Sequence, residues 1–102
     1  MEVRFKNDKE RAFYEDAKAL QKMFGKRMAE KIVQRIDDLL AAQNPQFLPR
    51  SIRWHEHQGK RSGLYSVDLV HPFRLIVRPL GEYDSYIEIT AVEVYEVFNS
   101  HK

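Results

Sequence analysis

The spacing of the apolar residues changes once along the chain, and this change limits the fold more than any other feature. Between residues 8 and 42, apolar side chains recur three or four positions apart, which is the period of an amphipathic helix. From residue 52 onward they tend to alternate with polar residues, as in a strand with one buried face. Helical and extended segments are therefore separated along the chain, and this order favours an α+β fold.

Gly25 divides the helical segment into two predicted helices, residues 8–24 and 26–42. Glycine readily takes the positive φ that ends a helix, and so short a turn permits only an antiparallel helical hairpin. Asn7 stands where its side-chain oxygen can cap the first helix. Basic residues on the outer helix faces, Arg35 among them, are expected to be solvated, although they could also attract RNA.

One strand is predicted before the helices and four after them. Residues 1–7 alternate in polarity, and further strands are predicted at residues 52–57, 63–70, 73–80 and 85–97. Pro72 has no N–H to donate and is therefore placed in a turn. The predicted order is β-α-α-β-β-β-β, with the helical hairpin packed on one face of a small twisted, mainly antiparallel sheet. The other face is expected to be open to solvent.

Composition excludes several classes of protein. With 102 residues, we expect a single domain spanning residues 1–102. The absence of cysteine excludes disulfides and thiolate-bound zinc. No apolar run approaches the roughly 20 residues of a membrane span, and the first residues lack the apolar core of a signal peptide. We therefore expect a cytoplasmic protein with no membrane partner.

Charge is distributed unevenly along the chain. Residues 50–79 carry six basic and two acidic side chains, a local net charge of +4, together with three of the four histidines. Residues 80–102 carry one basic and five acidic side chains, a net charge of −4. The basic segment favours an anionic partner such as nucleic acid. An ordinary solvated sheet face explains the same charges equally well.

Two arginines of the basic segment are spaced for one face of a strand. If Leu75 and Val77 face the helices, Arg74, Ile76 and Arg78 face the opposite side. A guanidinium suits phosphate because its planar fork donates two parallel hydrogen bonds. The alternative for Arg74 is a structural salt bridge to Glu88 or Glu93 of the last strand.

Histidines and aromatic residues supply the other candidates for chemistry. Arg53, His55 and His57 are two residues apart and share a predicted strand face, and histidine can transfer protons near neutral pH. Both histidines could equally be ordinary surface residues, and two imidazoles without a nearby carboxylate pair make an incomplete metal site. No metal or cofactor is therefore expected. A tyrosine on the open face, Tyr95 or Tyr65, could stack a base, whereas core packing suits Tyr65 better and is expected of Trp54.

Four short motifs in and around the basic segment resemble those of one protein family. In chain order they are Ile52-Arg53-Trp54-His55, Gly59-x-Arg61-x-Gly63, Tyr65-Ser66-Val67 and Phe73-Arg74-Leu75-Ile76-Val77-Arg78. Together with the predicted element order, they resemble the HigB-like branch, the plasmid maintenance killer proteins, of the RelE/ParE toxin superfamily. The topological resemblance covers most of the chain, whereas the motifs cover only residues 50–78.

The resemblance implies a function and a set of partners. It implies a toxin of a type II toxin–antitoxin system that acts as a metal-independent endoribonuclease, cutting messenger RNA on the ribosome and inhibiting translation. It also implies a helix-turn-helix, HigA-like antitoxin, with operator DNA bound only through that antitoxin. The notable alternatives are a toxin that is not a nuclease, such as a gyrase inhibitor, an inactive relative that only binds its antitoxin, or an RNA-binding sheet face unrelated to toxins.

The resemblance also assigns roles to individual residues. It implies catalytic roles for His55, Arg61 and Arg74. Residue type and position add Tyr95 as a further catalytic candidate, and Arg53, His57, Lys60 and Arg78 as candidate RNA contacts, although relatives usually have an apolar residue at the position of His57. The chain departs from its relatives at Ser66 and Asp68, where RelE itself has lysines, and at Lys60, where an acidic residue is common. The last strand has no clear counterpart of the arginine common in many relatives, so the proton donor for the leaving group is the least defined part of the set.

Overall fold

The computed structural model describes residues 1–57 and 63–101. Strand β1 (Glu2–Phe5) leads into helices α1 (Asp8–Glu15), α2 (Ala17–Phe24) and α3 (Lys26–Ala41). The predicted cap is confirmed, because the Asn7 side chain accepts a hydrogen bond of 2.8 Å from the Glu10 N–H. The predicted helix end is confirmed as well, because Gly25 takes a φ of +84° between α2 and α3.

The prediction of one continuous helix over residues 8–24 is wrong at Asp16. This residue has extended backbone angles, with φ −103° and ψ 102°, and it separates α1 from α2. Its carboxylate accepts hydrogen bonds from the N–H groups of Lys18 and Ala19, at 3.0 and 3.1 Å. Aspartate competes well for such unpaired helix N–H groups, so it starts a new helix here rather than continuing the old one.

The sheet has five strands within the described residues, in the order β1-β5-β4-β3-β2. The strands that follow the helices are β2 (His55–Glu56), β3 (Tyr65–Asp68), β4 (Phe73–Pro79) and β5 (Ala91–Asn99). Only the β1–β5 pairing is parallel among these strands, and the other pairings are antiparallel. The predicted α+β class and the mainly antiparallel sheet are therefore confirmed.

In two of the predicted strands, a 3₁₀ turn takes the place of the first residues. Residues 52–57 form a strand only at β2, because a 3₁₀ turn, η2 (Arg50–Ile52), precedes it and Arg53 has a φ of +56°. Residues 85–97 begin with another 3₁₀ turn, η4 (Tyr86–Glu88), before β5 starts. The Glu88 carboxylate closes that turn by accepting hydrogen bonds from the backbone N–H groups of Asp84 and Ser85. At η4, local side-chain capping thus overrides the alternating pattern.

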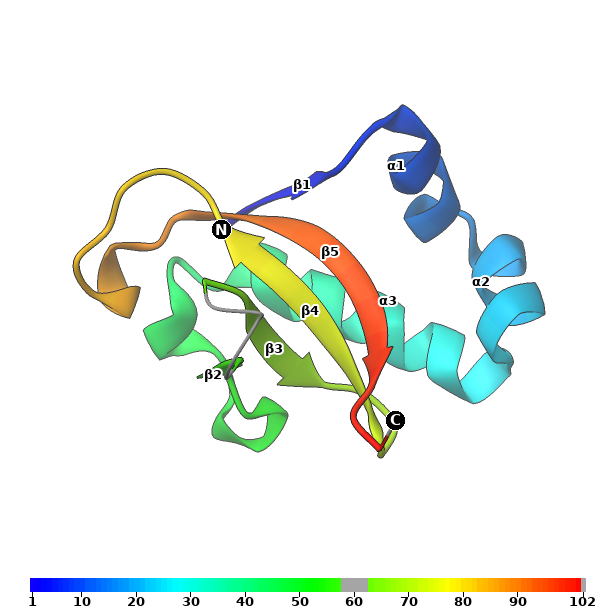
Figure 1. Cartoon of the computed structure of the whole chain (residues 1–102). Helices are drawn as coiled ribbons and strands as arrows, with labels where there is room; N and C mark the ends of the chain where they lie inside the picture. Colours follow the sequence, from blue (N-terminus) through cyan, green and yellow to red (C-terminus); the bar gives the residue numbers. More distant parts are fainter. Residues whose placement is uncertain (58–62, 102) are drawn as a thin grey trace.

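The main core lies between the sheet and α3, which runs behind β4 and β5 in Figure 1. Leu39 and Ile32 of α3 are fully buried, as are Leu75 and Val77 of β4. The predicted inward side of β4 is therefore confirmed. Arg35 is also buried, with 9% of its surface exposed, so its predicted solvated position is wrong.

The opposite sheet face is less open than expected. Ser66 of β3 and Ile76 of β4 lie on this side, and both are 0% exposed. Paired residues share a face, and β3 and β4 place Ser66 opposite Ile76. The side chains around them, described below, close this part of the face.

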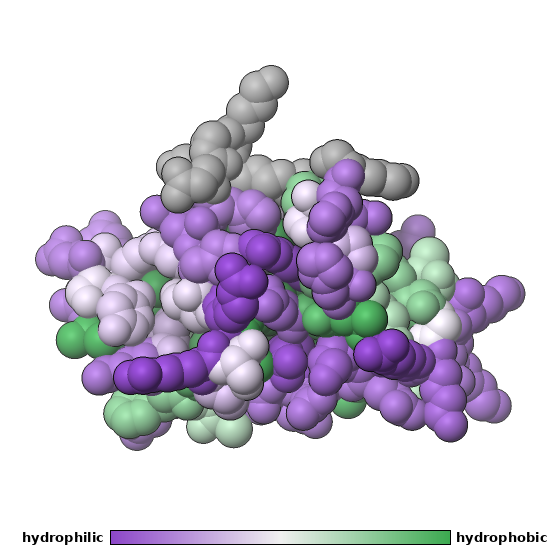
Figure 2. Space-filling view, turned by 90° about the horizontal axis from the view of Figure 1, so that it is seen from below, coloured by the Kyte–Doolittle hydropathy of each residue, from purple (hydrophilic) through white to green (hydrophobic). Residues whose placement is uncertain are grey.

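Seen from below, the surface is mostly hydrophilic, with apolar patches scattered between charged side chains (Figure 2). Among the described residues, no helix is both long and apolar enough to cross a membrane.

Candidate functional site on the sheet face

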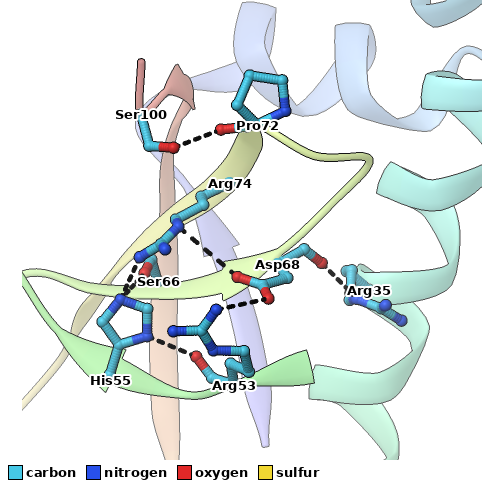
Figure 3. A network of polar contacts seen from close by, with 8 residues as sticks. All are labelled: Arg35, Arg53, His55, Ser66, Asp68, Pro72, Arg74 and Ser100. Carbon is cyan, nitrogen blue, oxygen red and sulfur yellow. Dashed lines mark hydrogen bonds and ion pairs between the residues drawn. The ribbon is translucent and has the colours of Figure 1, made fainter. Parts of the chain in front are cut away.

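Polar side chains from three neighbouring strands converge on one sheet face (Figure 3). The β2–β3 register places His55 opposite Ser66, and the β3–β4 register places Asp68 opposite Arg74. Arg53, just before β2, contributes both its side chain and its carbonyl group. We call these five residues the sheet-face cluster.

The contacts of His55 define which ring nitrogen carries its proton. Nδ1 lies 2.7 Å from the carbonyl oxygen of Arg53, and a carbonyl oxygen only accepts, so Nδ1 carries the hydrogen. The lone pair of Nε2 then accepts from Nη1 of Arg74 and from the hydroxyl of Ser66 at 3.3 Å. The imidazole is thereby held with its basic nitrogen toward the centre of the cluster.

Asp68 connects the two arginines of the cluster. Its carboxylate lies 3.6 Å from Nε of Arg74 and 3.8 Å from Nη1 of Arg53. The side chains of Arg74 and Asp68 are 23% and 26% exposed, whereas that of Arg53 is 63% exposed. With a neutral imidazole, two guanidiniums and one carboxylate leave the cluster with one net positive charge. An anion can therefore bind, but it must compete with Asp68 for both guanidiniums.

Arg35 anchors the strand that carries Asp68. Its Nε donates to the backbone carbonyl of Asp68 at 2.6 Å, and its Nη1 donates to the carboxylate of Asp38 at 3.1 Å. The guanidinium thus reaches from α3 to the end of β3, as Figure 3 shows. Because the charge is both paired and hydrogen-bonded, its burial is tolerated.

The remaining described residues predicted for the site lie around the cluster. His57 lies beside His55, with ring centroids 6.3 Å apart, and meets the Phe98 ring edge-on at 5.7 Å. Arg78 pairs with Glu93 at 3.3 Å, so the alternative predicted for Arg74, a bridge to the last strand, is realised by Arg78 instead. Lys60 and Arg61 lie outside the described residues.

Tyr95 is not brought into the cluster. It occupies the irregularity in the β4–β5 pairing, where Ile76 faces Glu96 and Val77 faces Val94. The ammonium of Lys6 lies 4.0 Å from the centre of its ring. Since β3 and β4 separate β5 from β2, Tyr95 lies about 14 Å from the His55 strand at ordinary strand spacing. Within the described residues, no contact joins it to His55 or Arg74.

Sequence reasoning missed three residues that organise the site, namely Ser66, Asp68 and Arg35. In the sequence, Ser66 lies in a family-like motif and both Ser66 and Asp68 mark departures from the RelE pattern, but neither was assigned a role in the site. Strand alternation could have identified them, because both lie on the sheet face opposite to Val67, which is buried. Nothing in the sequence indicates that Arg35 would reach β3.

Two hollows adjoin the cluster. A small one of about 80 Å³ is lined by Arg53, Asp68, Arg74 and His71, among others. A larger one of about 810 Å³ is lined by Arg53, Trp54 and Tyr65, among others. Trp54 and Tyr65 stack with centroids 4.7 Å apart. Both are half-buried and pack against the core, so their predicted core positions hold only in part.

Electrostatics and metal geometry add two observations. Burial raises the pKa of the Tyr65 phenol, and Tyr83 and Glu56 raise it further. This phenol therefore stays neutral near neutral pH.

Among the described residues, no three His, Asp or Glu side chains gather closely enough to hold a metal ion.

A solved structure described as a YoeB/ParE toxin from Agrobacterium tumefaciens is similar to this chain. The two match with a TM-score of 0.58 at 18% sequence identity, over 95% of this chain and 96% of that chain. No family model matches the sequence, and no curated protein matches it. The likeness therefore concerns the fold, and it confirms the predicted RelE-like arrangement of an N-terminal strand, helices and a mainly antiparallel sheet.

Proposed function

We propose that the chain is the toxin of a type II toxin–antitoxin system, of the HigB-like branch, and acts as a ribosome-dependent mRNA endoribonuclease. The observation that carries this proposal is the sheet-face cluster, in which the basic nitrogen of His55 meets the guanidinium of Arg74. Its position on a fold like that of a YoeB/ParE toxin supports the assignment. The proposed site of action is the cytoplasm.

In the proposed reaction, the 2′-hydroxyl of the RNA attacks the adjacent phosphate to form a 2′,3′-cyclic phosphate, and the 5′-oxygen leaves and takes up a proton from water. Nε2 of His55 takes the proton of the 2′-hydroxyl as general base. Arg74 and Arg53 donate to the phosphate oxygens, on which negative charge accumulates in the transition state. No metal or cofactor takes part.

Substrate binding would itself activate His55. In the structure, the lone pair of Nε2 is occupied by Nη1 of Arg74. A phosphate that attracts this N–H would leave Nε2 with only the longer contact to the Ser66 hydroxyl, whose hydrogen can rotate away so that Nε2 takes a proton. Ser66 remains beside the ring and keeps its orientation, while the Arg53 carbonyl holds the proton on Nδ1.

The remaining roles rest on the sequence alone, and only that of Arg61 is also implied by the family resemblance. Arg61 would add a further phosphate contact, and Tyr95 would stack a base of a neighbouring nucleotide. His57, Lys60 and Arg78 would contact the RNA backbone. Because Tyr95 lies away from the cluster, its role requires that the RNA extend across β3, β4 and β5.

The proposed partners are the ribosome with its mRNA and a helix-turn-helix, HigA-like antitoxin. Operator DNA would be bound only through the antitoxin. A small helix-turn-helix gene beside this one would support that partner.

Inducible expression followed by primer extension tests the proposed activity. Growth should stop and translated mRNA should be cut, while His55→Ala and Arg74→Ala should relieve both effects. Arg27→Ala, which removes an exposed helix charge, should remain toxic. Intact mRNA with inhibited gyrase would overturn the nuclease proposal in favour of a gyrase-type toxin. Salt-sensitive binding of naked RNA without growth arrest would favour an RNA-binding module.

A further inference from the structure

The larger hollow beside the cluster has the features of a nucleotide-binding site. It lies between η1 (Pro45–Phe47) and η2 on one side and the start of η4 on the other, and its volume is about 810 Å³. This volume falls within the range of small-molecule sites, about 300–1,000 Å³. Its lining includes the stacked pair Trp54 and Tyr65 together with Tyr86, which is 47% exposed.

Trp54 carries an unused hydrogen-bond donor. In the part of the chain that the structure describes, the indole Nε1–H is buried and has no hydrogen-bond partner. A buried donor without a partner is unfavourable, and it gains an interaction when a ligand supplies an acceptor. Purine rings carry ring-nitrogen acceptors at their edges and a flat face for stacking on aromatic side chains.

The charges around the hollow also match a nucleotide. Arg50 and Arg53 supply guanidiniums for a phosphate, and Asp84 supplies a carboxylate that can accept from the N–H groups of a base. Arg53 lines both this hollow and the small hollow beside Asp68 and Arg74. A base in the larger hollow would therefore have its phosphate next to the sheet-face cluster.

We propose that this hollow binds the purine base of a single-stranded ribonucleotide whose phosphate lies on Arg53. The inference rests on the proposed function, because it takes the ligand to be part of the RNA substrate. The base in the hollow then selects where the RNA is cut, while the cluster performs the cleavage. An acidic peptide is the other class of ligand that two guanidiniums beside aromatic side chains could attract.

Trp54 is the only tryptophan of the chain, so its fluorescence reports on the hollow directly. Full-length protein is titrated with 3′-GMP, 3′-AMP, 3′-UMP and 3′-CMP, and with ribose 5-phosphate and a hexaglutamate peptide as probes that lack a base. Purine nucleotides should quench the fluorescence saturably and bind several-fold tighter than pyrimidine nucleotides. Equal quenching by ribose 5-phosphate, or saturable quenching by the peptide alone, would overturn the proposal.

Matched variants separate stacking from surface effects. Tyr86 and Ile87 are neighbours in η4 and are 47% and 48% exposed, but only Tyr86 lines the hollow. Tyr86→Ala should weaken purine binding about tenfold, whereas Ile87→Ala should leave it unchanged. Trp54→Phe, measured by calorimetry, should weaken binding and reduce the preference for purines. Equal effects of Tyr86→Ala and Ile87→Ala would contradict the assignment.

Nucleotide binding and mRNA cleavage can fail independently. Purine binding that depends on Tyr86, in a protein that cuts no mRNA, would retain the binding site and refute the nuclease. Cleavage of mRNA without purine-dependent quenching of Trp54 would retain the nuclease and refute the binding site.

Discussion

Asp68→Asn should tighten RNA binding and slow RNA cleavage, two effects of opposite direction from one substitution. The Asp68 carboxylate lies 3.6 Å from Nε of Arg74 and 3.8 Å from Nη1 of Arg53. It therefore occupies the guanidiniums that a phosphate would use. It also holds Arg74 in position toward His55, so its loss should misplace the group that we propose stabilises the transition state.

The size of the binding effect follows from Coulomb's law. A phosphate on both guanidiniums would lie roughly 6 Å from the carboxylate, where two negative charges repel by about 3 kcal/mol at an effective dielectric constant of 20 and by about 0.7 kcal/mol in bulk water. Asp68 is 26% exposed, so an intermediate value of about 1–2 kcal/mol applies. This corresponds to roughly five- to thirtyfold tighter binding.

Fluorescence anisotropy with a labelled, 2′-O-methylated RNA measures binding without cleavage, at several salt concentrations. Glu93→Gln is the matched control, because it removes one carboxylate from the same sheet face, where Glu93 pairs with Arg78. The Asp68→Asn variant should bind the RNA more tightly than this control, and its RNA affinity should fall more steeply with salt concentration. On ribosomes, its cleavage rate should fall about tenfold.

The fold should survive Asp68→Asn, because Arg35 binds the backbone carbonyl of residue 68 rather than its carboxylate. Circular dichroism and thermal unfolding check this point. An affinity gain no larger than that of Glu93→Gln would refute the view that Asp68 competes with phosphate. Faster cleavage in the Asn variant would refute the view that Asp68 positions Arg74.

Three further predictions concern stability. Arg35→Met should lower the free energy of unfolding by about 2–4 kcal/mol, because it leaves buried partners unpaired. The control Arg27→Met, on the exposed side of the same helix, should change this free energy by less than about 0.5 kcal/mol. Urea unfolding of both variants measures the two changes. Burial raises the pKa of Tyr14 to about 12. The neutral phenol therefore contributes its full stability below about pH 10. This contribution, up to about 2.7 kcal/mol, is lost as the pH rises from about 10 to 12. Tyr14→Phe should remove this part of the alkaline loss, and Tyr86→Phe should not, as unfolding measured across that pH range will reveal. Asp16→Ala should cost about 1 kcal/mol through loss of the α2 cap, and an unchanged unfolding midpoint would contradict the capping role.

Much of the fold could be predicted because the relevant forces act over short distances in sequence. Gly25 ends a helix through its own backbone freedom, and Asn7 caps the helix that begins beside it. The periods of the apolar residues identified the elements and their order. The errors arose where one local effect opposed another, as when the carboxylate of Asp16 divided a helix that the apolar stripe would have continued.

The site was only partly predictable, because its contacts join residues that lie far apart in sequence. His55 and Arg74 were selected by residue type and by family resemblance, and the structure brings them into contact. Tyr95 was selected by residue type and by its place in the last strand, and the structure places it beside Lys6 instead. Residue type indicates what a side chain can do chemically, but it does not indicate which side chains meet.

The sequence by itself determined the element types, the inward side of β4 and the presence of a basic, histidine-bearing segment. Only the tertiary structure decided that Asp68 faces Arg74, that Ser66 faces His55, and that Arg35 crosses from α3 to β3. These contacts depend on strand register and on the docking of a helix over a sheet. Both are settled by the packing of the whole core, in which residues far apart in sequence must fill one space together.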